Sequence, residues 1–161
     1  MHKEAEKQVS IHRSWEGTWM TKREVSRILA RASKEEVAET ASIVYERCRV
    51  QIMKQPQKTL VMVKARESIK KSLFYLGEVL ASECMVLVDG VKGAGMIAGD
   101  DFEKAVAAAV IDGFLNLEGR QDEKKVILDR LLMLENRQAE KRAELNLAVQ
   151  KSKVNFNVMG E

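Results

Sequence analysis

Residues 88–101 read VDGVKGAGMIAGDD and decide how the middle of this chain folds, because four glycines fall within ten positions. Three of them, Gly93, Gly95 and Gly99, are spaced almost like the glycines of a dinucleotide-binding loop. That fingerprint requires G-x-G-x-x-G to follow a strand and to open a helix directly, so that backbone N–H groups and the helix dipole meet the pyrophosphate. Here the third glycine comes one position late, and no Lys-Ser or Lys-Thr pair follows to complete a P-loop.

The neighbouring residues favour a hairpin. CMVLV (84–88) and AGMIA (94–98) are typical of strands, DGVKG (89–93) is typical of the turn between them, and Gly99 admits the chain to a helix. Asp100 and Asp101 would place carboxylates at the positive end of that helix, where they repel a phosphate. The sequence therefore predicts a glycine-containing turn in this stretch, in preference to a phosphate-binding loop.

Capping signals and hydrophobic periods extend this prediction in both directions. Thr21 with Glu24 and Ser33 with Glu36 form capping boxes, which predict two short helices. A period of two then predicts strands in RVQIMKQ (49–55) and KTLVMVKAR (58–66) with a turn at PQ (56–57), then an exposed basic loop ESIKKS (67–72) and the strand residues LFYLGEVLA (73–81). Residues 100–119 and a charged segment from about Asp122 to Ser152 are predicted as helices.

These elements predict an α+β fold in which an antiparallel sheet packs with an N-terminal helical pair and two C-terminal helices. We expect an N-terminal lead at residues 1–20, one domain at 21–152 that includes the long helix, and a strand-like C-terminal arm at 153–161. At 161 residues the chain is long enough for one ordinary hydrophobic core.

Composition argues against several classes of function. The net charge is only +3, with basic and acidic residues intermixed, which argues against a nucleic-acid partner, and no apolar run is long enough to span a membrane. Cys48 and Cys84 are isolated thiols without metal-ligand spacing, which fits a reducing, cytoplasmic compartment. The only histidines, His2 and His12, lie in the polar lead. We therefore expect no catalytic, cofactor-binding or metal site in this chain.

A group of carboxylates in the helical segment that follows Gly99 allows two interpretations. Asp100, Asp101, Glu103 and Asp112 could form a magnesium cluster, since carboxylate oxygens suit that ion. The pattern favours instead a helix cap, a solvated first turn and a residue on a helix face.

The C-terminus carries an unusual pattern. ENRQAEKRAE (135–144) is almost devoid of apolar residues, yet Val154, Phe156 and Val158 then alternate as in a strand. With Met159, they form a candidate partner-binding tail that could add to another subunit by β-augmentation or segment exchange. The tail could equally fold back onto the sheet of its own chain, and the residues leave both possibilities open.

The run from Phe74 to Leu115 resembles the central signature of the PhnG family, the G subunit of the carbon–phosphorus lyase core complex. The family shows an aromatic residue before Gly-Glu, an apolar strand, a Gly-x-Gly pair, a further glycine before an acidic residue, and an Ala-rich helix containing Ile-Asp. The matching positions, in order, are Phe74, Gly77, Glu78, Gly93, Gly95, Gly99, Asp101 and Asp112. ILARASKEEVAE (28–39) and the tail are similar to the family's opening and closing blocks.

The resemblance implies a place in an assembly with PhnH, PhnI and PhnJ, acting with PhnL, and we also expect self-association. In that family the G, H and I subunits with PhnL replace the adenine of ATP by a phosphonate, giving ribose 1-phosphonate 5-triphosphate. The resemblance thus implies ATP and magnesium for the complex and an iron–sulfur cluster in the partner PhnJ. This chain would be an accessory subunit that is not catalytic alone. Two alternatives remain: a stand-alone nucleotide-binding protein and a small homodimeric adaptor.

Overall fold

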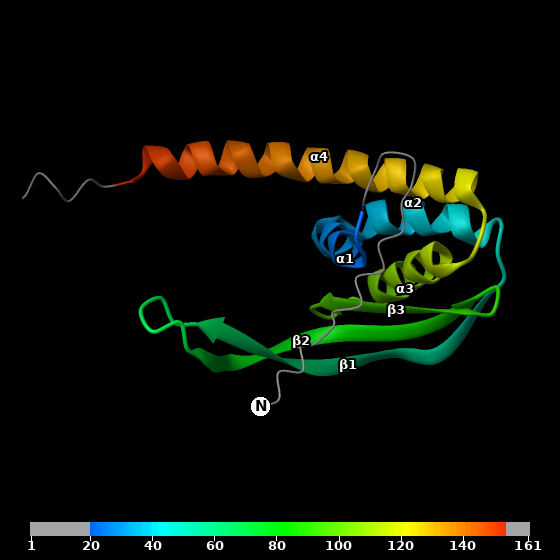
Figure 1. Cartoon of the computed structure of the whole chain (residues 1–161), viewed down its shortest axis with the longest axis horizontal. Coiled ribbons are helices and arrows are strands. Elements are labelled where there is room, and N and C mark those ends of the chain that lie inside the picture. The colour runs from blue at the N-terminus through cyan, green and yellow to red at the C-terminus, as the bar shows by residue number, and fades with distance from the viewer. Residues whose placement is uncertain (1–19, 154–161) are drawn as a thin grey trace, which may run out of the picture.

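A computed structural model describes residues 20–153 of the chain (Figure 1). Two helices come first, three strands follow, and two further helices complete the order. The elements are α1 (Lys22–Arg31), α2 (Lys34–Tyr45), β1 (Val50–Arg66), β2 (Leu73–Val88), β3 (Val91–Ala98), α3 (Phe102–Asn116) and α4 (Gln121–Lys151). The α+β prediction, with an antiparallel sheet between two pairs of helices, is confirmed.

Both N-terminal helices begin at the predicted capping boxes. The Glu24 backbone N–H donates to Thr21 Oγ1 at 3.3 Å, and the Thr21 N–H donates to the Glu24 carboxylate at 2.6 Å. Ser33 and Glu36 repeat the arrangement at 3.2 and 2.8 Å. Each box supplies a hydrogen-bond acceptor to the backbone N–H of the N-cap residue and to one N–H of the first turn. The helix itself offers these N–H groups no acceptor.

The sheet has the order β1-β2-β3, and both pairings are antiparallel. Strand β3 pairs with β2 only between Ala81 and Val88, whereas β1 pairs with β2 along its whole length. Residues 60–80 therefore form a two-stranded ribbon that extends beyond the rest of the sheet. From here on the arm means this ribbon, and the C-terminal segment 153–161 is called the tail. Figure 1 shows the arm reaching well past α1, α2 and α3 on one side.

The predicted turn at Pro56 is wrong, because β1 runs straight through that residue. The pairing with β2 shifts register between Lys54 and Gln57, so the proline lies at an irregularity of an edge strand. Proline lacks a backbone N–H, and an edge strand at a bulge is where a sheet tolerates that loss.

The hairpin between β2 and β3 is tighter than predicted. Its turn consists of Asp89 and Gly90 alone, and β3 begins at Val91. Both turn residues have positive φ, 45° and 84°, as the primed turns that suit hairpins require. The prediction that the turn extends through DGVKG to Gly93 is therefore wrong, and Gly93 and Gly95 are interior residues of β3.

Helix α3 fills the middle of the molecule. One face of the sheet, with Cys84, Val86 and Val88, packs against α3, and α2 covers the opposite side of this helix. Because α3 is enclosed on both sides, more than half of its residues are buried, and most of the buried ones are alanines and branched aliphatics. Helix α4 lies across the outside of the helical layer (Figure 1). No described helix has the length and apolar character needed to cross a membrane.

Candidate functional site

The two glycines of β3 allow the strand to approach α3 backbone to backbone. A Cβ built on Gly93 would lie 2.6 Å from Gly113 Cα, and one built on Gly95 would lie 2.7 Å from the Ala109 N. Real Cβ atoms do not approach backbone that closely, so any side chain here would force the helix off the sheet. The Gly-x-Gly pair therefore lies where β3 packs directly against α3, and we call this contact the seam.

The acidic motif residue Asp112 connects the elements that meet at the same seam. Asp112, on α3, accepts a hydrogen bond from the Ala94 backbone N–H between the two glycines at 3.0 Å. Lys22 Nζ lies 3.1 Å from the other Asp112 oxygen, and Asn116 Nδ2 donates to the carboxylate at 3.3 Å. The carboxylate joins α3, β3 and the start of α1. A hollow beside it holds about 30 Å³, room for a water molecule or two but not for a nucleotide.

Gly99 and Asp101 form the passage from β3 into α3. Gly99 has φ +99°, as predicted for a glycine that redirects the chain. Asp101 is the N-cap residue, whose side chain accepts from the Lys104 N–H at 3.0 Å. Sequence reasoning missed Ser82: its buried hydroxyl donates to the Gly99 carbonyl at 2.9 Å and accepts from the Asp101 N–H at 3.0 Å. A single serine in an apolar strand is the only sequence signal that could have pointed to it.

The carboxylates weighed as a magnesium cluster do not converge. Asp100 pairs with Lys58 at 2.6 Å, and Glu103 pairs with Lys34. Asp101 caps α3 while Asp112 serves the seam. Within residues 20–153, no group of three or more His, Cys, Asp or Glu side chains is placed to hold a metal ion.

The two cysteines have surroundings that disfavour the thiolate. Burial raises the pKa of the Cys84 thiol, which donates to the Lys54 carbonyl at 3.4 Å. Burial, assisted by the Asp89 carboxylate, also raises the pKa of Cys48, although Arg120 lies against its sulfur. A nucleophilic cysteine needs a lowered pKa, so neither thiol is activated.

The remaining motif residues lie apart from the seam, on the arm. Phe74 is 47% exposed, and the carboxylate of Glu78 has no partner among the described residues. Gly77 has φ +153° and stands where the β1–β2 register shifts by one residue. The eight motif positions therefore divide into five that build the β3–α3 junction and three on an exposed ribbon.

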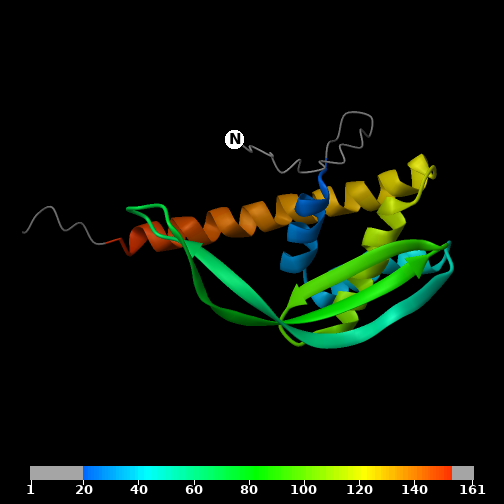
Figure 2. The ribbon, with the colours of Figure 1, turned by 60° about the horizontal axis from the view of Figure 1, so that its bottom comes forward.

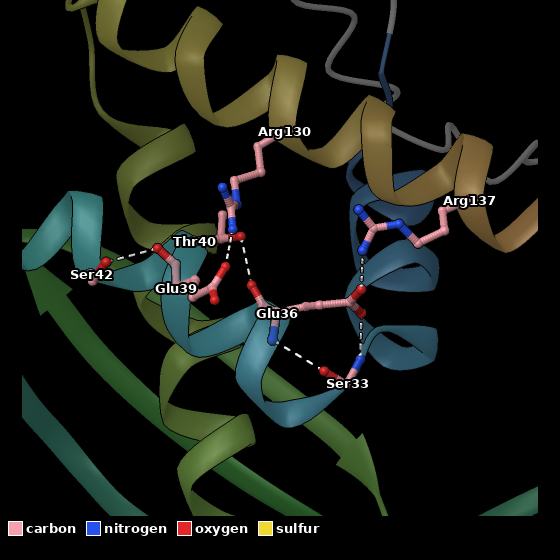
Figure 3. Close-up of polar contacts among 7 residues, drawn as sticks. All are labelled: Ser33, Glu36, Glu39, Thr40, Ser42, Arg130 and Arg137. Carbon is pink, nitrogen blue, oxygen red and sulfur yellow. Dashed lines mark hydrogen bonds and ion pairs between the residues drawn. The ribbon is translucent and has the colours of Figure 1, made fainter.

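Helix α4 is attached to the body along only part of its length. Figure 3 shows Arg130 reaching Glu39 and Arg137 reaching Glu36, both on α2. The hydrogen bond that the Glu36 carboxylate accepts from the Ser33 backbone N–H, followed by the pairing with Arg137, holds the pKa of Glu36 below its usual range. The last tie is the hydrogen bond from Gln138 Nε2 to the Ile28 carbonyl at 3.0 Å.

Beyond that tie, residues 139–151 of α4 are all exposed, and we call this segment the prong. None of the residues in the polar stretch 135–144 is buried. The predicted partner-binding residues Val154, Phe156, Val158 and Met159 lie outside the described residues, as do the lead residues 1–19.

Fold and side chains together define a small α+β protein whose glycines and carboxylates serve packing and whose most unusual surface is an exposed apolar ribbon. The family model of the phosphonate metabolism protein PhnG matches residues 20–160. The chain therefore belongs to the PhnG family and has a role in phosphonate metabolism, as the resemblance implied. A search of curated proteins found no match.

Proposed function

We propose that this chain is an accessory subunit of a carbon–phosphorus lyase complex. In that role it supports the displacement of adenine from ATP by an alkylphosphonate, which gives ribose 1-phosphonate 5-triphosphate. The observation that carries the proposal is the family match over residues 20–160. The division of the motif residues supports it, because the four side chains among them (Phe74, Glu78, Asp101 and Asp112) do not come together as a reaction centre, while three of the eight positions lie on an exposed surface.

We assign the chemistry of the reaction to partner chains. PhnH, PhnI and PhnJ, acting with PhnL, are the proposed partners, and ATP, magnesium and the iron–sulfur cluster belong to them in this proposal. The described residues of this chain contribute packing and contact surfaces. We also propose that the assembly contains more than one copy of this chain.

The proposed contact of the tail rests on the course of α4. The prong carries α4 away from the body as far as Lys151 (Figure 1). We therefore propose that the apolar tail, which follows the prong in the sequence, contacts a neighbouring subunit by β-augmentation or segment exchange.

Reconstitution tests the function directly. PhnH, PhnI, PhnJ and PhnL are supplied with ATP and methylphosphonate, with and without this chain, and the phosphonate product is followed by phosphorus NMR. We expect product only when the chain is present. Product at the full rate without it would refute the accessory role. Binding of ATP by the isolated chain in calorimetry would favour the stand-alone nucleotide-binding protein instead, and a homodimer that ignores all four partners would favour the adaptor.

Phe156→Ala tests the tail. A buried Phe→Ala change typically costs about 3–5 kcal/mol, and each 1.4 kcal/mol lost at an interface weakens affinity about tenfold. We expect the isolated chain to melt almost unchanged while assembly with the partner subunits weakens sharply. Asn157→Ala is the matched control, because Asn157 is one of the polar residues that alternate with the apolar ones in the tail. A large fall in melting temperature with assembly intact would place the tail on its own domain. Truncation after Lys151 should reproduce the assembly defect.

A further inference from the structure

The arm is apolar on both of its faces. The strand register places Leu60, Met62 and Leu80 on one face, where they are 61%, 56% and 40% exposed. Val79 and Phe74 lie on the other face, 43% and 47% exposed. A ribbon that rests on a single surface needs only one apolar face. Two apolar faces indicate a segment that is enclosed on both sides.

The arm also has two free backbone edges. Beyond Ala81, β2 has lost its partner β3 and is paired with β1 alone. Isolated two-stranded ribbons are marginally stable in water, and unpaired edges are templates for further strands. Among the described residues, no strand pairs with the outer edge of residues 73–80, where only the Leu80 carbonyl is engaged, by the Gly99 N–H at 2.8 Å. Residues 73–80 are all exposed, so within the described part of the chain the arm is held mainly by its own β1–β2 pairing.

The prong projects in the same direction as the arm. Figures 1 and 2, which differ by a rotation of 60°, both show the two segments leaving the body on the same side. The seven residues of β1 in the arm extend about 23 Å, and the thirteen residues of the prong extend about 20 Å. Leu145 and Val149, four residues apart and therefore on one face, are 63% and 59% exposed. The molecule thus presents two apolar projections of similar length.

Charge distinguishes between the possible occupants of these surfaces. The arm carries four basic and two acidic side chains, and the prong carries three basic and two acidic ones. Two copies of the chain that met through these segments would bring net positive charge together, which opposes association. A partner with an apolar surface bordered by Asp and Glu residues would be complementary to both segments.

We propose that the arm inserts into a groove of a different polypeptide, lined by apolar side chains and bordered by carboxylates, which covers both faces and pairs with the edge at residues 73–80. The prong contacts the acidic border of the same partner. The inference deepens the proposed function, on which it rests in one respect: the partner is sought first among the subunits of the lyase complex. Any self-association of this chain then uses a surface other than the arm.

Two substitutions, one on each face, test the insertion in the full-length chain. Met62→Ser and Phe74→Ser should leave the melting temperature of the isolated chain nearly unchanged and its oligomeric state, measured by sedimentation, the same as that of the unaltered chain. Each should weaken binding to the co-purified PhnH, PhnI and PhnJ subunits by about thirtyfold, the effect of removing a hot-spot residue. Met96→Ser is the matched control, because Met96 is 55% exposed on β3 and lies off the arm. Raised salt should slow association of the unaltered chain.

Two results would overturn the inference: full-strength binding by both arm variants, or a dimer of the isolated chain that either variant dissociates. If the unaltered chain fails to bind the three subunits, the proposed function fails, and the arm is then judged by a photo-cross-linker placed at position 74 in the native cell. A link to a different chain that is lost on Met62→Ser supports insertion. Links only between copies of this chain, links that survive the substitution, or no links at all would overturn it.

Discussion

Gly95→Ala is the most direct test of the seam between β3 and α3. The added methyl group would lie 2.7 Å from the Ala109 N and closer still to the Ala105 carbonyl oxygen, so one helix turn meets it with backbone on both sides. Backbone cannot rotate away as a side chain can, and overpacking of this kind typically costs about 1–3 kcal/mol. We expect the upper end of that range, about 3 kcal/mol.

For a chain of this size, each kcal/mol shifts the melting temperature by about 2–4 °C, so a loss of about 3 kcal/mol predicts a fall of about 6–12 °C. Urea unfolding followed by circular dichroism measures the free energy, and calorimetry measures the midpoint. Ala94→Val is the matched control, because it enlarges the residue between the two glycines on the exposed face of the same strand. Equal stability of both variants would contradict the packing role of the glycine. If Gly95→Ala kept the stability of the unaltered chain but bound ATP less tightly, the glycines would instead have a phosphate-binding role.

Two further predictions concern helix caps. Asp101→Ala removes the acceptor of the Lys104 N–H and should cost about 1 kcal/mol in urea unfolding, whereas Asp101→Asn, which keeps an acceptor, should cost less; equal losses would contradict the capping role. The lowered pKa of Glu36 means that its ionised form stabilises the fold at neutral pH and that this contribution fades as the pH falls below about 4.5 through the folded-state pKa. The stability difference between the unaltered chain and Glu36→Gln should therefore shrink on acidification, while the exposed control Glu140→Gln should show little difference at any pH.

Local signals in the sequence predicted the helices well. Thr21 and Ser33 cap α1 and α2 because the capping box is complete within four residues, and Asp101 caps α3 through a single bond from the Lys104 N–H three residues on. The two-residue period likewise identified the strands. In each cap the side chain and the backbone group that it bonds are close in sequence, so the local sequence is enough to predict the hydrogen bond.

The missed features depend on contacts between distant residues. Gly93 faces α3 residues far along the chain, and the same glycine in an isolated segment is a reasonable turn residue. Pro56 was interpreted as a turn because proline disrupts interior strands, but β1 proves to be an edge strand. The arm was missed because its length depends on where β3 stops pairing with β2. The sequence groups the eight motif positions together, and only the structure separates those that build the seam from those on the arm.

One junction connects the bases of both projecting segments. Asp89, in the hairpin turn, accepts the Arg49 N–H at 2.8 Å, which holds its pKa below the usual range, and its other oxygen lies 3.0 Å from Arg120. Arg49 immediately precedes β1, and Arg120 immediately precedes α4. The strands that form the arm and the helix that ends in the prong are therefore tied together at the end of the molecule opposite their tips (Figure 1). Because Glu36 and Arg137 fix α4 again midway, the direction of the prong relative to the arm is set within this chain before any partner binds. Less conformational freedom is lost on binding when the bases of both projections are already held in position, even though the arm itself still has to be ordered by its partner. The packing of the body therefore contributes to affinity at a surface that it does not touch.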